Sequence, residues 1–169
     1  MTPAVALLDD AFTRIGEHAS TVVDGLSTDD LSHRIAPDAN TIGWLVWHLT
    51  RVQDHHVAEI LDTQQVWVGD EWASRFGLDP DPSNTGYGHR ASEVLTVQPE
   101  SPRALVEYLD AVAQRTRGML TGVDEVGLDR IVDRRWDPPV TLGVRLVSIA
   151  DDCLQHAGQA NYIRGLLDT

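Results

Sequence analysis

The segment Asp152-Cys153-Leu154-Gln155-His156-Ala157-Gly158-Gln159 decides the interpretation of this chain, and it lies within a longer run from Thr141 to Leu167. Apolar residues recur through that run at the three- and four-residue spacing of an α-helix. Asp152 and His156 are four residues apart, so on a helix their side chains lie on one face, one turn apart. A carboxylate oxygen and an imidazole nitrogen held in this way can share one divalent metal ion.

A third ligand has to come from another part of the chain, because two protein ligands rarely make a tight metal site. The best candidate is His48 in the segment Trp44-Leu45-Val46-Trp47-His48-Leu49, which also has helical spacing and is otherwise apolar. The spacing leaves another reading open, because a histidine on an apolar face is usually a core residue with satisfied hydrogen bonds. Asp152 could then pair with Arg51 or Arg145 instead of a metal.

Helical periodicity predicts four long helices, which together indicate an all-α protein with the architecture of a four-helix bundle. Asn40 or Thr41 can cap the second helix, and Ser101 followed by Pro102 is a favourable start for the third. The expected ranges are residues 3–26, 40–62, 102–121 and 141–167.

Long connections are expected between the second and third helices and between the third and fourth. In the first, we predict a short helix near residues 71–75 and a break at residues 79–84. Its aromatic residues, Trp67, Trp72 and Tyr87, could cover a pocket or simply pack against the core. In the second, residues 131–136 could form a short extended piece.

Composition limits the possible functions. The 169 residues suggest one domain, and the formal net charge of −13, with no lysine, argues against nucleic-acid binding. No apolar run approaches the roughly 20 residues of a membrane span, so no membrane partner is expected. We predict no signal peptide, and the single cysteine, Cys153, fits a cytoplasmic location. We interpret Cys153 as a small core residue and not as a nucleophile.

Two motifs resemble those of the DinB/YfiT-like superfamily. The segment His156-Ala157-Gly158-Gln159-Ala160-Asn161-Tyr162-Ile163-Arg164 resembles the C-terminal helix motif, in which a metal-binding residue precedes the histidine by four positions. The segment around His48 is similar to the second-helix motif, in which leucine follows histidine. The matches occur in the order of the family, and the resemblance implies one DinB-like four-helix bundle domain over residues 1–169.

The resemblance also implies a metal site and a homodimer. Family members commonly hold a divalent metal, often zinc or nickel, with three residues, which correspond here to His48, Asp152 and His156 as metal-binding and catalytic residues. Many members have histidine in place of Asp152. The branch of mycothiol-dependent maleylpyruvate isomerases has glutamate there, so the carboxylate of this chain points to that branch, although aspartate is one methylene shorter.

The function implied by the resemblance is that of a metal-dependent thiol transferase or isomerase. Such a protein activates a low-molecular-weight thiol such as mycothiol as a metal-bound thiolate, and its partners are that thiol and a small electrophile. Three alternatives remain open: a metal-dependent hydrolase that uses activated water, a non-catalytic metal- or ligand-binding bundle linked to stress, and a metal-free bundle with a buried hydrogen-bond network.

Three further residues are candidates for binding the cosubstrate or supporting the metal. Gln159 follows His156 by three positions and could hydrogen-bond around the metal, or serve only in helix packing. His55 shares a helical face with His48 and could line the pocket, although a solvated or core histidine is the more common explanation. Arg164, like Arg51, could bind a substrate carboxylate, although surface arginines are commonly without such a role.

Overall fold

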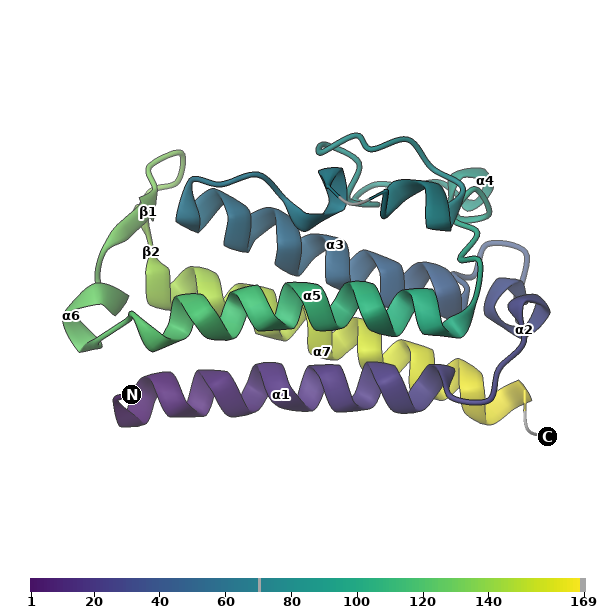
Figure 1. Cartoon of the computed structure of the whole chain (residues 1–169), viewed down its shortest axis with the longest axis horizontal. Helices are drawn as coiled ribbons and strands as arrows, with labels where there is room; N and C mark the ends of the chain where they lie inside the picture. The colour runs from purple at the N-terminus through teal and green to yellow at the C-terminus, as the bar shows by residue number, and fades with distance from the viewer. Residues whose placement is uncertain (70, 168–169) are drawn as a thin grey trace.

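Four long helices form the protein in the computed structural model, which describes residues 1–69 and 71–167. They are α1 (Pro3–Val23), α3 (Ile42–Leu61), α5 (Pro102–Thr121) and α7 (Leu142–Leu167) (Figure 1). The prediction of an all-α four-helix bundle is therefore confirmed. The shorter elements are α2 (Thr28–Ser32), η1 (Val66–Val68), η2 (Ala73–Phe76), α4 (Ala91–Val94), α6 (Glu125–Leu128), β1 (Ile131–Asp133) and β2 (Val140–Thr141).

Side-chain caps fix where the long helices begin. The hydroxyl of Thr41 accepts a hydrogen bond from the backbone N–H of Trp44, and the hydroxyl of Ser101 accepts one from Ala104. Each cap satisfies a donor that has no partner inside its helix. The first helix ends at Val23, three residues earlier than expected, because the next residues turn sharply through Gly25, which has a φ of +72°.

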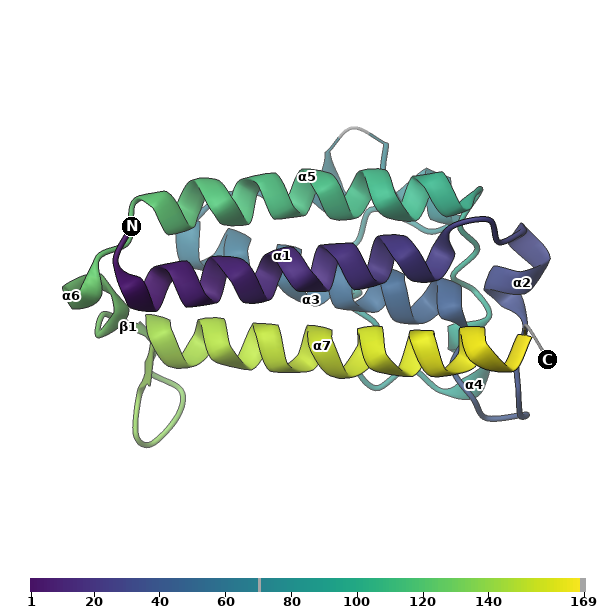
Figure 2. The same cartoon turned by 90° about the horizontal axis from the view of Figure 1, so that it is seen from below.

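The helices pack as a four-sided bundle. Both α1 and α3 contact α7 on one side and α5 on the other (Figure 1). Figure 2 shows α1 between α5 and α7, with α3 behind it. Largely apolar side chains from all four helices fill the centre, and those with almost no exposure include Val5, Ile15, Leu45, Trp47, Leu105, Tyr108 and Leu146.

The connection from α3 to α5 covers the outer side of α3 and buries polar groups there (Figure 1). Arg51 and Asp54 are fully buried, and their side chains form an ion pair at 3.4 Å. The Tyr108 hydroxyl donates a hydrogen bond to Asp54 at 2.8 Å, and burial raises the pKa of Tyr108. Trp67 is also fully buried, so core packing, one of the two readings left open for it, explains this tryptophan.

The connection from α5 to α7 contains α6 and a small antiparallel hairpin of β1 and β2, in which Ile131 pairs with Thr141. The extended piece expected here covers only Ile131–Asp133. Asp133 at the end of β1 is buried and forms ion pairs with Arg135 and Arg145. Within the described residues, no helix is both long and apolar enough to cross a membrane.

Candidate metal centre

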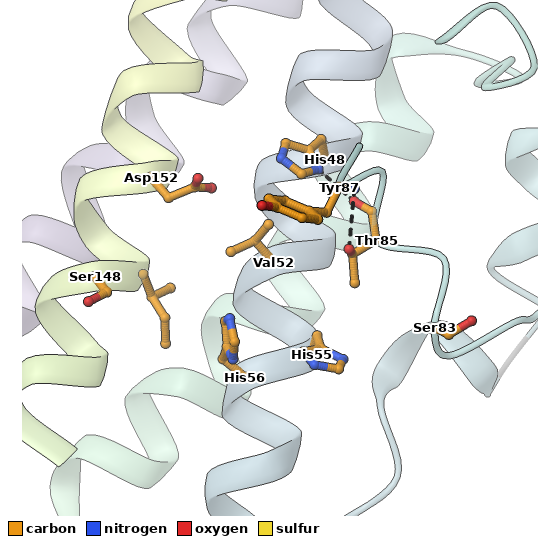
Figure 3. Close-up of a pocket in the computed structure, with 10 residues that line it drawn as sticks. His48, Val52, His55, His56, Ser83, Thr85, Tyr87, Ser148 and Asp152 are labelled. Atoms are coloured by element: carbon orange, nitrogen blue, oxygen red, sulfur yellow. Dashed lines mark hydrogen bonds between the residues drawn. The ribbon is translucent and has the colours of Figure 1, made fainter. Parts of the chain in front are cut away.

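His48, Asp152 and His156 come together between α3 and α7. One possible ligand atom from each residue lies within 4.8 Å of the other two. The middle of α3 supplies His48, and adjacent turns of α7 supply the other two. Figure 3 shows His48 and Asp152 on opposite sides of the same cavity.

The orientation of His48 is fixed by the loop that follows residue 82. Its Nδ1 atom lies 2.5 Å from the carbonyl oxygen of Thr85 (Figure 3). A carbonyl can only accept, so Nδ1 carries the proton and Nε2 keeps its lone pair. The ring of Trp44 stacks on the imidazole of His48, with 4.6 Å between the ring centroids. Burial lowers the pKa of His48, which keeps the ring neutral at neutral pH, the form that binds metals.

His156 is oriented in the same way by Gln159. The Nδ1 atom of His156 lies 3.0 Å from the side-chain oxygen of Gln159, so Nδ1 donates and Nε2 is free. That Nε2 atom is 3.7 Å from Oδ1 of Asp152. The amide of Gln159 thus acts on the ring of His156, one of the two roles considered for it from the sequence.

Asp152 has an unsatisfied oxygen. Its Oδ2 atom is buried and accepts no hydrogen bond from any residue that the structure describes. The two arginines considered as partners are engaged elsewhere, Arg51 with Asp54 and Arg145 with Asp133. A buried carboxylate oxygen without a partner is costly, and a bound cation would remove that cost.

The three side chains fit a divalent metal by their chemistry. Two neutral imidazoles and one carboxylate form the ligand set of many open zinc sites, in which a further position is left for water or substrate. Tetrahedral zinc with bonds of about 2.0–2.1 Å holds its ligand atoms about 3.4 Å apart. The separation of 3.7 Å between Asp152 and His156 is close to that value.

Four residues of the loop were not singled out as site residues from the sequence: Asn84, Thr85, Gly86 and His89. The indole N–H of Trp44 donates to Nδ1 of His89, and Nε2 of His89 donates to the side-chain oxygen of Asn84. This clamp holds the loop on α3, where the Thr85 carbonyl meets the imidazole. The sequence signal for the loop is the pair of glycines at 86 and 88, both of which have positive φ.

Gly86 permits the closest approach of the loop to α3. A Cβ atom at this position would lie 2.8 Å from Nδ1 of His48 and 2.8 Å from the ring of Trp47. The backbone of Gly86 also has a φ of +88°, a conformation that residues with a Cβ atom rarely adopt.

A cavity of about 500 Å³ runs beside His48 and Asp152, between α3, α7 and the loop. His48 and Asp152 line one end, and His55 and His56 line the other (Figure 3). His55 is therefore a lining residue, one of the two readings open for it. Tyr87 also lines the cavity and is 93% exposed.

Two sequence candidates lie elsewhere. The guanidinium of Arg164 donates to the backbone oxygens of Val22 and Asp24 at the end of α1, so the structure does not bring Arg164 to the cavity. Arg51 is enclosed in the buried network around Asp54. Cys153 is fully buried, its thiol donates to the Leu49 carbonyl at 3.3 Å, and burial raises its pKa, as expected for a core residue.

The bundle and the side chains between its second and fourth long helices define a DinB/YfiT-like protein. The family model described as "MST: Mycothiol-S-transferase" matches residues 7–169, and the chain belongs to this family. A solved structure, described as the crystal structure of the conserved protein of locus from Enterococcus faecalis, is similar over 97% of this chain and 96% of that one. Its TM-score is 0.88 at 28% sequence identity. No curated protein matches the chain.

Proposed function

We propose that this chain is a divalent-metal-dependent thiol transferase or isomerase that uses mycothiol or a similar thiol. The observation that carries the proposal is the unpartnered Oδ2 atom of Asp152, which lies beside two histidines whose Nε2 atoms are free. Membership of the mycothiol S-transferase family supports the choice of thiol. Zinc is the metal we expect, and nickel is the alternative, because imidazole binds both.

His48, Asp152 and His156 would hold the ion. A divalent ion bound there would lower the pKa of a thiol and so supply it as a thiolate at neutral pH. The surrounding residues orient these ligands: the Thr85 carbonyl and Gln159 fix the two imidazole tautomers, and Trp44 covers one face of His48. Val52 and Ile149 give the cavity apolar walls beside His48 and Asp152.

The nucleophile has to arrive with the cosubstrate. Cys153 is the single cysteine of the chain, and its buried thiol donates a hydrogen bond to the Leu49 carbonyl. Burial also raises the pKa of this thiol. Such a thiol is unreactive at neutral pH. The sulfur of a soluble thiol, delivered through the open cavity, is the remaining source for transfer to an electrophile.

Metal content is the first test. Protein purified without a metal-affinity tag should contain about one equivalent of metal, and His48→Ala and Asp152→Ala should lose it. His18→Ala, on the exposed side of α1, is a matched control that should retain it. The metal-loaded parent should then transfer mycothiol to monochlorobimane, and the two metal-free variants should not.

Each outcome has a defined meaning. A parent that takes up neither zinc nor nickel would reject the proposal. Thiol-independent hydrolysis of esters by the loaded parent, without transfer, would support the hydrolase alternative, and metal binding without either activity would support a binding protein.

We also propose that the protein forms a homodimer through the outer face of α7. Val144, Val147 and Tyr162 on that face are more than half exposed, at 55%, 58% and 67%. Gly158 lies in open space, because an added Cβ atom would have no neighbour within 4 Å. A helix that is apolar on both faces commonly packs against a second partner. Sedimentation velocity of the parent should show a dimer, and a monomer at micromolar concentration would reject this proposal.

A further inference from the structure

The cavity extends well beyond the three candidate ligands. Eight residues separate His48 from His56 on α3, which corresponds to about 12 Å along a helix. Val52 lies between them, and Ser148 of α7 faces them across the cavity (Figure 3). A ligand with its reacting atom beside His48 therefore needs an extended body to reach His56.

The two histidines at the far end have unused hydrogen-bonding groups. Nδ1 of His55 accepts from the side-chain amide of Gln65 at 3.1 Å, so its proton is on Nε2, which can donate. Nδ1 of His56 is buried and has no hydrogen-bond partner among the described residues, because Glu59 lies 3.5 Å away without hydrogen-bond geometry. Burial, and then the charge of Arg145, lower the pKa of His56, so the neutral ring can both donate and accept.

This end of the cavity offers no free positive charge in the described part of the chain. The residues that line the cavity include no arginine, and Asp152 is the one charged side chain among them. Arg145 lies near His56, but its guanidinium is 2.7 Å from Asp133. Arg135 binds Asp133 at 2.9 Å and Glu59 at 3.2 Å. A ligand carboxylate would therefore find no cationic side chain to pair with here, whereas hydroxyl groups could both donate to and accept from the neutral side chains.

A second metal ion suits this end less well. His55, His56 and Glu59 do have possible ligand atoms within 4.8 Å of one another. However, the Glu59 carboxylate is already paired with Arg135 at 3.2 Å. The surroundings favour an uncharged, polar ligand.

We propose that the His55–His56 end of the cavity binds the uncharged, hydroxyl-rich body of an extended thiol, with His56 and Ser148 as specificity-determining residues. The inference rests on the proposed function for the position of the sulfur beside His48. It adds a direction to that function: the thiol lies along the groove between α3 and α7, and peptide thiols with free carboxylates bind poorly.

Binding of S-methyl mycothiol, measured by titration calorimetry, tests the inference without requiring thiolate formation or transfer. Loss of one neutral hydrogen bond weakens binding about three- to tenfold, which is the increase in Kd expected for His56→Leu. Ser148→Ala should raise Kd about two- to threefold. It serves as a second variant because Ser148 is exposed, so its replacement should leave the fold intact. His18→Leu, outside the cavity, should bind as the parent does. S-methyl glutathione, which carries two carboxylates, should bind the parent at least tenfold more weakly than S-methyl mycothiol.

Equal Kd values for the parent, His56→Leu and Ser148→Ala would overturn the inference, as would the absence of binding to the parent. Equal binding of the two S-methyl thiols would overturn the assignment of an uncharged body. Binding that depends on His56 in a protein that neither holds metal nor transfers thiols would support the subsite and reject the proposed function. The two proposals can therefore fail separately.

Discussion

Replacement of Gly86 by alanine tests whether the loop sets the orientation of His48. The substitution places a methyl group 2.8 Å from Nδ1 of His48 and 2.8 Å from the ring of Trp47, so either the loop or the rings must move. We expect the loop to move, because the rings are held between helices in the bundle core. That movement breaks the hydrogen bond between His48 and the Thr85 carbonyl.

The structure supplies a matched control in Gly88. Its φ of +76° is close to the +88° of Gly86, so both alanine variants bear a similar backbone cost of about 1–2 kcal/mol. A Cβ atom at Gly88 has no neighbour within 4 Å, however. The contact with His48 and Trp47 should add about 1–3 kcal/mol to the destabilisation of Gly86→Ala alone. Loss of a group that orients a ligand typically lowers metal affinity about 10- to 100-fold.

Two measurements decide the outcome. Urea unfolding of the metal-free proteins gives the difference in the free energy of unfolding between the two variants, and competition with a chromophoric chelator gives their zinc affinities. Gly86→Ala should bind zinc at least tenfold more weakly than Gly88→Ala. Equal zinc affinities and equal stabilities in the two variants would refute the assigned role of the loop.

Three further predictions concern other parts of the chain. Gln159→Leu removes the acceptor that fixes the tautomer of His156, so zinc affinity should fall about tenfold in the chelator competition, and an unchanged affinity would exclude this role. Gly16→Ala should raise the free energy of unfolding by about 0.5–1 kcal/mol in urea titrations, because an added Cβ atom at this helical position has no neighbour within 4 Å. Gly158 also has no neighbour within 4 Å of an added Cβ atom in the single chain, but it lies on the proposed dimer face. Gly158→Ala should therefore weaken the dimer in sedimentation velocity. Hydrogen bonds from Arg135 hold the pKa of Asp133 well below its ordinary value near 4. The contribution of Asp133 to stability is therefore present above pH 4 and is lost as the pH falls below 4. Asp133→Asn should therefore lose less stability than the parent between pH 5 and pH 3 in urea titrations, and equal losses would contradict this.

The sequence predicted those parts of the molecule that depend on local spacing. The start of α3 after Thr41 and of α5 after Ser101 follows from capping residues next to apolar repeats. The pairing of Asp152 with His156 follows in the same way, because four residues correspond to about one turn of helix. What spacing could not decide was whether Asp152 forms an ion pair with an arginine. That answer depends on Asp54 and Asp133, which occupy the two arginines considered, and no local pattern shows those contacts.

Arg164 shows the limit of a motif more clearly. It follows His156 by eight residues, which places it about 12 Å further along α7, at the level where α1 ends. There its guanidinium meets backbone oxygens of Val22 and Asp24, because the C-terminal carbonyls of a helix attract positive charge. The motif that contains both Arg164 and the candidate ligand His156 therefore combines residues that lie at different places in the structure and contact different groups.

The loop around Thr85 is the part of the site that the sequence predicts least well, and it orients the imidazole of His48. The carbonyl that fixes the imidazole is a backbone atom, which any residue type at position 85 would provide. Its position depends instead on the glycine at 86, which allows the close approach, and on the clamp from Trp44 through His89 to Asn84. His48 and Trp44, the first residue of the clamp, are one turn apart on α3, so the same helix face both carries the candidate metal ligand and holds the loop that orients it. A change in this loop should therefore alter metal affinity without touching a ligand.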